Sequence, residues 1–249
     1  MLGLGSDLTT FEKPFSPNDI SNLVRWYKVN TGIIGEDGGT TAAGTMADAE
    51  EINAWQDQTR NSNAVQATGE DQPHWEDDEP GAVKFDNTAD MTFTAEEISA
   101  NTDFTIILRL KPISFGTDVL LASDTNNFIR WHSNALIKVK IGGAGISSFE
   151  DGSNTISTSV YSTIVLVRSN GSTGNLNVYV KPSNASEVDW DSAENHTDTD
   201  ALVVSIIGAE SDDSKSLDAY VKDVLIYNGT ALDEAQRTNM YSYLESQVY

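Results

Sequence analysis

The stretch DFTIILRLK, residues 103–111, decides the class of fold. Apolar side chains recur at every second position in it, which is the period of a β-strand with one face in a core. Residues 135–141 (ALIKVKI) and 175–181 (NLNVYVK) alternate in the same way. Residues 163–168 (TIVLVR) and 202–207 (LVVSII) are instead apolar on both faces. We therefore expect three half-buried strands and two central strands that are covered on both sides.

Further strand candidates, five of them short and the last one long, surround these five. They are residues 82–86, 91–94, 119–123, 127–132, 157–161 and 217–227. The connections are rich in turn formers, such as NGSTG at 170–174 and GGAG at 142–145. Because about a dozen short strands follow one another without long helices between them, the pattern predicts an all-β sandwich or barrel. It disfavours a parallel α/β fold.

One helix is expected near the C-terminus. Asp233 can cap its start, and Gln236 stands three residues later, which is the spacing of a capping box. Met240 and Leu244 are four residues apart and therefore share one side of such a helix. The spacing predicts a helix over residues 234–247 that packs this side against the sandwich.

The charge of the chain excludes several classes of partner. The 249 residues include 15 Lys and Arg against 38 Asp and Glu, a formal net charge of −23 at pH 7. A field of this sign repels phosphate, so we expect no nucleic acid and no anionic membrane surface as a partner. The acidic balance fits either the surface of a protein from a marine or halophilic source or a specific basic partner.

Several further features are not expected because of what the sequence lacks. It contains no cysteine, which excludes disulfides, thiolate metal sites and thiol catalysis. No apolar run has the length of a membrane span. The first residues lack the basic start and the long apolar segment of a secretory signal, so secretion is not expected.

Four segments occur together in an order that points to one superfamily. They are PNDI and LVRWY at 17–20 and 23–27, WQDQTRNSNAVQ at 55–66, AVKFD at 82–86, and VLIYNGTAL at 224–232 followed by Arg237 and Tyr243-Leu244. This order resembles the concanavalin A-like jelly roll of laminin-G-type domains, and most of all its bacterial and phage branch. In that branch W-x-D-x-S-G-N-x-N-x-x-Q precedes a V-x-F-D strand. Thr59-Arg60-Asn61 stand in place of S-G-N here, so that turn is expected to differ.

The resemblance implies an all-β concanavalin A-like jelly-roll sandwich. Two curved antiparallel sheets would pack face to face, with a short C-terminal helix and with the two termini near one another. We expect one such domain over residues 16–249, preceded by an extended N-terminal arm over residues 1–15. Trp26, Trp55 and Phe85 are large apolar residues beside turn signals and are suited to closing the ends of the sandwich.

The opening residues MLGLG resemble the start of virion structural proteins of marine phages. Together with the jelly-roll resemblance, the lack of a catalytic set and of a secretory signal, and the acidic, cysteine-free composition, this predicts a non-enzymatic virion protein. It would be assembled in the host cytoplasm and exposed on the particle as capsid decoration or as a tail or fibre component. Its partners would be other virion proteins, such as the major capsid protein, or further copies of itself. The arm would dock on a neighbour through its apolar side chains, because termini stay mobile unless docked. These are Leu2, Leu4, Leu8 and Phe11.

The alternative is a carbohydrate-binding module for adhesion to a host. Glycan binding needs an exposed aromatic ring near amides or acids. Trp190 is the preferred candidate for a glycan contact because it lies in the polar stretch 182–200, which reads as a long loop. For Trp75 and Trp131 we expect packing in the core instead.

A glycosidase is the third and least favoured hypothesis. Glycosidases of this fold carry E-x-D-x-x-E on a strand, so that alternate acids flank the sugar bond. Glu187 and Asp189 fit the first two positions, but the third falls at Ser192. The segment follows Pro182 in a polar stretch, so a solvated acidic loop is the favoured interpretation. We expect no catalytic residues.

No metal or other cofactor is expected, and calcium alone is left open. Calcium prefers several oxygen ligands, and the acidic loops offer three sets of them. None of these has the spacing D-x-[DN]-x-[DN]-G, and the three histidines, His74, His132 and His196, have no zinc spacing. The three sets are Asp57, Asn61, Asp86 and Asn87; Asp198 and Asp200; and Glu210, Asp212 and Asp213.

Overall fold

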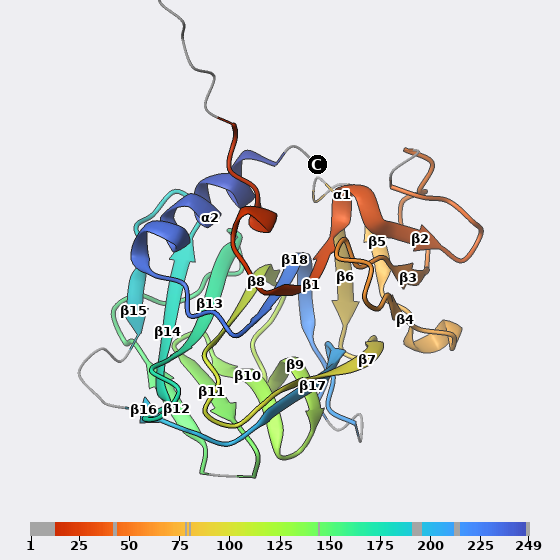
Figure 1. Ribbon diagram of the computed structural model, residues 1–249. Coiled ribbons are helices and arrows are strands. Elements are labelled where there is room, and N and C mark those ends of the chain that lie inside the picture. Colours follow the sequence, from red (N-terminus) through yellow and green to blue (C-terminus); the bar gives the residue numbers. More distant parts are fainter. Residues whose placement is uncertain are drawn as a thin grey trace, which may run out of the picture.

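Two antiparallel sheets, each of nine strands over the residues that the structure describes, pack face to face as a sandwich (Figure 1). The structure is a computed structural model and describes residues 13–41, 44–77, 79, 81–143, 145–190, 196–211 and 215–247. The two packed sheets confirm the expected all-β sandwich.

Sheet A consists, in spatial order, of β15 (Val188–Trp190), β14 (Asn175–Pro182), β13 (Ser162–Ser169), β8 (Phe104–Pro112), β18 (Asp218–Asn228), β6 (Ala82–Asp86) and β5 (His74–Glu76), with β1 (Leu23–Lys28) beside β18 and β16 (His196–Thr197) beside β14. Sheet B consists of β12 (Ser147–Glu150), β11 (Leu136–Lys140), β10 (Asn127–Ser133), β9 (Asp118–Asp124), β17 (Leu202–Ile207), β7 (Met91–Ile98), β4 (Ala64–Val65), β3 (Ile52–Trp55) and β2 (Ile33–Gly35). The helical segments are 3₁₀ turns at Pro17–Asp19 and Gly69–Asp71, the single turn α1 (Val29–Gly32), and α2 (Glu234–Ser246).

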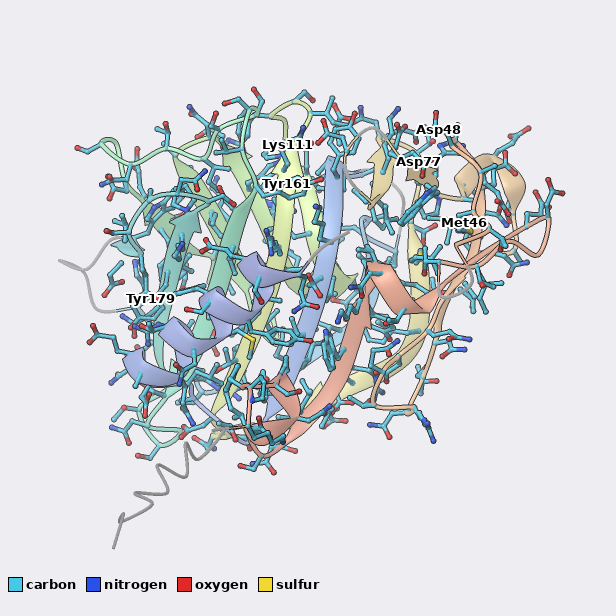
Figure 2. The ribbon with its side chains drawn as sticks, turned by 90° about the horizontal axis from the view of Figure 1, so that it is seen from above. Met46, Asp48, Asp77, Lys111, Tyr161 and Tyr179 are labelled. Atoms are coloured by element: carbon cyan, nitrogen blue, oxygen red, sulfur yellow. The ribbon has the colours of Figure 1, made fainter. Side chains whose placement is uncertain are left out.

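Apolar side chains form two layers. The larger layer lies between the sheets and takes in the inward-facing residues of both. The second lies on the outer face of sheet A, where Ile107, Val165 and Leu225 pack beneath Met240 and Leu244 of α2. Figures 1 and 2 both show α2 lying across this face. Sheet A is therefore covered on both sides over the part that α2 spans.

The second layer overturns one prediction about β8. We expected a half-buried strand over residues 103–111, but every residue from Phe104 to Leu110 is buried. On the outer face α2 covers Ile107, and Arg109 packs beside the ring of Tyr161. A strand with alternating polarity in sequence is thus buried on both faces by elements far from it along the chain. The sequence of the strand itself does not indicate that a helix covers it.

Most other strand predictions are confirmed. β11 and β14 alternate between buried and partly exposed residues, and β13 is buried on both faces. β17 lies between β7 and β9 as a central strand, but Val203 and Ser205 are only partly buried, so its outer face is not fully covered. Residues 157–161 form turns rather than a strand. The strand at the edge of sheet B is β12 instead. Its sequence, SSFE, lacks the alternation of apolar and polar residues from which a strand is predicted.

Helix α2 begins where the capping box predicts. The Asp233 carboxylate accepts a hydrogen bond from the backbone N–H of Gln236 at 2.8 Å, and the Gln236 side chain accepts one from the backbone N–H of Asp233 at 3.0 Å. Met240 and Leu244 are fully buried. Among the described residues, no helix is both long and apolar enough to cross a membrane.

The two described ends of the chain lie together beside α2. The ring of Phe15 packs edge-on against Tyr243, with 6.2 Å between ring centroids. The expected proximity of the termini themselves stays a prediction, because residues 1–12 and 248–249 lie outside the described part of the chain. The predicted docking residues of the arm, Leu2, Leu4, Leu8 and Phe11, lie outside the described residues.

Candidate functional site

A pocket with a volume of about 360 Å³ opens at one edge of the sandwich. One wall is built by β14, β15 and their connection, which form the edge of sheet A. The other wall is the loop that follows β12, the edge strand of sheet B. We call this hollow the edge pocket; its lining residues are Ser153, Asn154, Thr155, Val180, Pro182, Ala185, Ser186, Val188 and Trp190.

The floor of the edge pocket is apolar because of the strand alternation. β14 and β15 pair in the register Val178↔Trp190 and Val180↔Val188, so these four side chains share one face of sheet A. Val178 and Val180 belong to the core between the sheets. The pocket is therefore an opening into the apolar layer at the edge of the sandwich, where sheets A and B are not joined.

The rim of the edge pocket is polar and held in place. The Asp151 carboxylate accepts hydrogen bonds from the backbone N–H groups of Ser153 at 2.8 Å and Asn154 at 3.0 Å, and from the Asn154 side-chain amide at 3.0 Å. These bonds lower the pKa of Asp151. At the end of the loop, the N–H of Ile156 donates to Asn134 O at 2.8 Å. A ligand would meet an Asn154 amide whose orientation is already set.

Trp190 lies in the pocket, but not as predicted. We expected an exposed ring in a polar loop, whereas Trp190 stands on β15 with 1% of its surface exposed. Pairing of β15 with β14 turns its side chain into the core rather than toward water. Its indole N–H finds no hydrogen-bond partner among the described residues, although burial makes such a group costly. Its role as a glycan contact stays a prediction.

The acidic residues of the same segment face the other way. The Glu187 carboxylate accepts hydrogen bonds from Nε and Nη2 of Arg237, both at 2.9 Å, and from the Tyr241 hydroxyl. Burial opposes ionisation of Glu187, but these donors outweigh it and lower its pKa. Asp189 pairs across the strands with Tyr179, which lies beside α2 (Figure 2). Burial raises the pKa of Asp189, against the opposing charge of Arg237.

This arrangement separates the predicted acid pair from the pocket. Val188 and Trp190 point toward the pocket floor, and the alternate residues Glu187 and Asp189 point toward α2. Among the described residues, the lining of the edge pocket contains no carboxylate. Ser192, the third position of the motif, lies outside the described residues. The expected solvated acidic loop is therefore wrong for Glu187, which is held in an ion pair.

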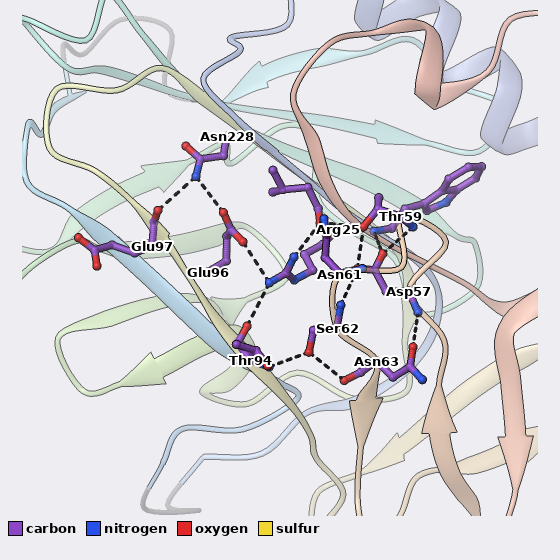
Figure 3. A network of polar contacts seen from close by, with 12 residues as sticks. Arg25, Asp57, Thr59, Asn61, Ser62, Asn63, Thr94, Glu96, Glu97 and Asn228 are labelled. Carbon is purple, nitrogen blue, oxygen red and sulfur yellow. Dashed lines mark hydrogen bonds and ion pairs between the residues drawn. The ribbon is translucent and has the colours of Figure 1, made fainter.

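The motif at residues 55–66 builds a structural turn instead of a calcium site (Figure 3). One oxygen of the Asp57 carboxylate accepts from the backbone N–H of Trp26 at 3.0 Å and of Thr59 at 2.9 Å. The other accepts from the Thr59 hydroxyl at 2.7 Å and from the N–H groups of Asn61 and Ser62, both at 3.2 Å. Asp57 is 3% exposed. Its oxygens are thus occupied by donors from β1 and from its own turn.

The same turn explains why Arg60 can stand where the family pattern has glycine. Arg60 adopts a φ of 65°, in the left-handed region that glycine favours. The five hydrogen bonds to Asp57 hold the backbone in this conformation. The surrounding contacts thus hold an arginine in a conformation that glycine adopts more easily, and the expected difference from the family's turn stays a prediction.

The other predicted metal ligands are scattered or engaged elsewhere. Within the described part of the chain, no three His, Asp or Glu side chains form a group that could hold a metal ion. Asp86 lies 3.7 Å from His74, Asp198 accepts from the N–H of Asp200, and Glu210 is paired with Arg130 and Lys215. Asn87 takes a left-handed turn conformation. Asp212 and Asp213 lie outside the described residues.

The remaining aromatic and imidazole candidates have structural surroundings. Trp75 and Trp131 are core residues, as expected, and their indole N–H groups donate to Asp77 and Asp118 at 2.6 Å. His132 lies 3.2 Å from the Thr117 hydroxyl, and the ring of His196 packs against Phe149. The three histidines stand on β5, β10 and β16 and do not form a common site.

Most residues of the rim of the edge pocket carry no signal in the sequence. Ser153, Asn154 and Ser186 come from two loops that are about thirty residues apart and carry no motif. The one available signal is Asp151 followed by Gly-Ser-Asn, because aspartate commonly bonds to backbone N–H groups two and three residues on. That signal predicts a tight turn but not the pocket beside it.

Comparison with known proteins agrees with this architecture. The family model of the concanavalin A-like lectin/glucanases superfamily, in its laminin-G form, matches residues 85–236, which is more than half of the chain. No curated protein sequence matches the chain at a significant level.

Solved structures with the same fold share little sequence with the chain. Domain 4 of AbnA, an extracellular arabinanase from Geobacillus stearothermophilus, has a TM-score of 0.56 and 16% identity, over 88% of this chain and 98% of that one. Trypanosoma rangeli sialidase has a TM-score of 0.52 and 12% identity, over 91% of this chain but 33% of its own. The binding domain of botulinum neurotoxin serotype D/C has a TM-score of 0.51 and 11% identity, over 93% and 54%. The chain thus spans about a third of the sialidase and about half of the toxin domain. The chain belongs to the concanavalin A-like lectin/glucanase superfamily.

Proposed function

We propose that this domain is a carbohydrate-binding module and that the edge pocket receives a short neutral glycan. The observation that carries the proposal is the composition of the pocket, in which an apolar floor ending at Trp190 faces the preset amide of Asn154 and the hydroxyls of nearby serines. Sugar rings have apolar faces and hydroxyl edges, so they are matched by such a surface. The volume of about 360 Å³ lies in the range of small-molecule sites.

The proposal is binding without catalysis. A glycosidase of this class needs two carboxyl groups on either side of the scissile bond. Among the described residues, the carboxylates nearest in sequence to the pocket floor, Glu187 and Asp189, lie on the face turned toward α2. The arabinanase domain that this fold matches nearly end to end was solved with arabinotriose, which makes that trisaccharide a suitable first probe.

The proposed setting of the module is the surface of a phage particle, where it would serve in adhesion to a host. This part rests on the resemblance of the opening residues MLGLG. Pro14 and Phe15 lie against Tyr243 of α2, and none of these residues lines the edge pocket. The described end of the arm, Pro14 and Phe15, therefore takes no part in the lining of the pocket. Deletion of residues 1–15 should abolish incorporation into particles and preserve glycan binding.

Glycan binding is tested by calorimetric titration with arabinotriose, after a glycan array has been screened for stronger ligands. Ala185→Phe places a ring in the mouth of the pocket and should abolish binding, and Asn154→Ala should weaken it about tenfold, the typical effect of a lost hydrogen bond to a ligand. The matched controls are Ala100→Phe in the β7–β8 loop and Asn53→Ala on β3, both exposed and outside the pocket. Binding by Ala185→Phe at wild-type affinity would overturn the proposal.

A further inference from the structure

The chain contains two Asn-Gly pairs, Asn170-Gly171 and Asn228-Gly229, and each stands where a strand ends. Asn-Gly is the dipeptide in which an asparagine side chain reacts most readily with its own backbone, because glycine has no Cβ atom to shield the peptide nitrogen. Neither pair belongs to the lining of the edge pocket. The two pairs share their chemistry and differ in their surroundings, so any difference in reactivity between them comes from the fold.

The reaction is deamidation through a cyclic intermediate. The backbone nitrogen of the glycine loses its proton and attacks Cγ of the asparagine side chain. A C–N bond forms, and the side-chain nitrogen leaves as ammonia. Water then opens the five-membered succinimide ring at one of its two carbonyl groups, which gives aspartate or isoaspartate. One water is taken up and one ammonia is released, and the reaction requires that both the glycine N–H and the asparagine side chain are free to move.

Asn170-Gly171 meets both requirements. Asn170 is exposed at the start of the loop between β13 and β14. Its side-chain oxygen accepts one long hydrogen bond, at 3.3 Å from the Ser172 hydroxyl, and neither its amide nitrogen nor the N–H of Gly171 donates to any described residue. The loop is closed by the N–H groups of Thr173 and Gly174, which donate to the backbone O of Asn170 at 2.8 and 2.9 Å. These bonds leave the two reacting groups untouched.

Asn228-Gly229 is held at both reacting groups. The side-chain amide of Asn228 donates to the Glu96 carboxylate at 2.8 Å and to the backbone O of Glu97 at 3.2 Å, as Figure 3 shows. The N–H of Gly229 donates to the backbone O of Asp103 at 2.8 Å. Hydrogen bonds from β7 and from the residue before β8 must therefore open before Asn228 can react, and a bond to a charged group such as Glu96 is among the stronger ones.

The packing of the β13–β14 loop accounts for the reactive pair. Asn170 has a φ of 55°, in the left-handed region that asparagine tolerates better than most residues. Gly171 lies so close to the β7–β8 loop that a Cβ atom there would meet the backbone O of Asn101 at 1.9 Å. The loop thus favours asparagine at its first position and requires glycine at the second. The same requirement leaves the peptide nitrogen of Gly171 unshielded.

We propose that Asn170 is a site of spontaneous deamidation in the folded protein, and that hydrogen bonds protect Asn228 from the same reaction. Conversion adds one negative charge to a chain whose net charge is −23. Aspartate at position 170 keeps the oxygen that accepts from Ser172, whereas isoaspartate lengthens the main chain by one carbon and displaces Gly171 from Asn101. The isoaspartyl form should therefore be the less stable product.

This inference does not depend on the proposed function. The β13–β14 loop precedes Asn175, the first residue of β14, and the β14 residues that line the edge pocket are Val180 and Pro182 at the other end of the strand. Protein that has deamidated at Asn170 should therefore bind arabinotriose with the affinity of fresh protein. If fresh protein fails to bind arabinotriose, the proposed function fails and this inference stands.

The test is peptide mapping by mass spectrometry after incubation of the full chain at mildly alkaline pH, in native buffer and in guanidinium chloride. The denatured sample sets the duration, which lasts until both Asn-Gly pairs have converted there. Over the same time in native buffer, Asn170 should become a mixture of aspartate and isoaspartate, and Asn228 should remain an amide. The rate at Asn170 should rise with pH, because the attacking nitrogen must lose a proton.

Asn170→Asp is the matched control, because it carries the charge of the product from the start and has no amide to lose. Its peptide map should stay unchanged in native buffer, and the aged wild-type protein, which contains isoaspartate, should melt at a lower temperature than this variant. If Asn170 persists in folded protein as long as Asn228, the loop suppresses the reaction and the inference is overturned. Conversion of Asn228 in folded protein as fast as Asn170 would show that its hydrogen bonds do not protect it, which also overturns the inference.

Discussion

Glu187 and Arg237 form a bidentate ion pair that joins the β14–β15 connection to helix α2, with both N–O distances at 2.9 Å. The guanidinium of Arg237 also lies 3.6 Å from the centroid of the Tyr179 ring. One wall of the edge pocket is therefore attached to the helix on the opposite side of the sheet. The pair has a positioning role, because it sets the connection from which Ser186 and Val188 enter the pocket.

Replacement of Arg237 by methionine should destabilise the protein by about 2–4 kcal/mol, because it leaves the Glu187 carboxylate partly buried without its partner. Urea unfolding at pH 7 measures this. Glu187→Gln keeps the shape of the side chain and some of its hydrogen bonds, and should destabilise the protein less than Arg237→Met does. Substitutions at ordinary surface positions change the free energy of unfolding by about 0.5 kcal/mol or less. A change of only about this size in Arg237→Met would contradict the role given to the pair.

The same pair predicts an acid dependence. The folded pKa of Glu187 is lowered, so its contribution is present above the unfolded value of about 4.3 and is lost as the pH falls through the folded pKa. Glu187→Gln should therefore lose less stability than wild type between about pH 4.5 and pH 2. Denaturant unfolding across this range gives the comparison. Parallel curves for the two proteins would show that Glu187 titrates normally in the folded state.

Asp57→Ala should destabilise the protein by at least about 3 kcal/mol, since it leaves buried backbone donors of Trp26 and of its own turn without an acceptor. The variant should lose the same stability with and without calcium, because hydrogen-bond donors occupy both oxygens of this carboxylate. Melting temperatures in calcium and in chelator provide the measurement. A calcium-dependent stabilisation that disappears in Asp57→Ala would restore a metal role for this turn.

Arg60→Gly should stabilise the protein by up to about 1 kcal/mol. The φ of 65° at this position is strained for arginine and unstrained for glycine, and the larger entropy of glycine in the unfolded chain offsets only part of the gain. Asn61→Gly is a control in the same turn that removes a side-chain bond to Val24 O and should destabilise. If Arg60→Gly is destabilising as well, the arginine side chain makes a contribution that this account lacks.

Lys222→Met should respond to pH differently from wild type, because Lys222 is 4% exposed and its amine lies near Arg109 and Asp223. Burial, together with the charge of Arg109, lowers the pKa of Lys222 to about 8. The unfolded chain therefore binds more protons between about pH 8 and pH 10.4, and wild-type stability rises with pH in that window. The variant has no amine at this position, so its stability should fall relative to wild type there, as denaturant unfolding across the window measures. A constant difference up to pH 10 would contradict the lowered pKa.

The sequence allowed the architecture to be predicted, because strand period, turn residues and the capping box at Asp233 are local signals. β8 shows the limit of such signals, since its burial on both faces depends on α2 far along the chain. Trp190 shows the same limit at the site. Its acidic neighbours suggest a loop in water, but pairing of β15 with β14 buries it. The β-bulge of β18 between Val221 and Asp223 also depends on long-range pairing, with β8, and could not be predicted.

The most direct test of glycan binding in the edge pocket is an NMR titration of the five tryptophan indole N–H signals with arabinotriose. Trp190→Phe assigns the signal of Trp190, which is the tryptophan among the pocket-lining residues. We predict that this signal shifts progressively with ligand while the signals of Trp26, Trp55, Trp75 and Trp131 stay in place. Binding that leaves the Trp190 signal unmoved, or that moves another indole instead, would contradict the assignment of the edge pocket as the glycan site.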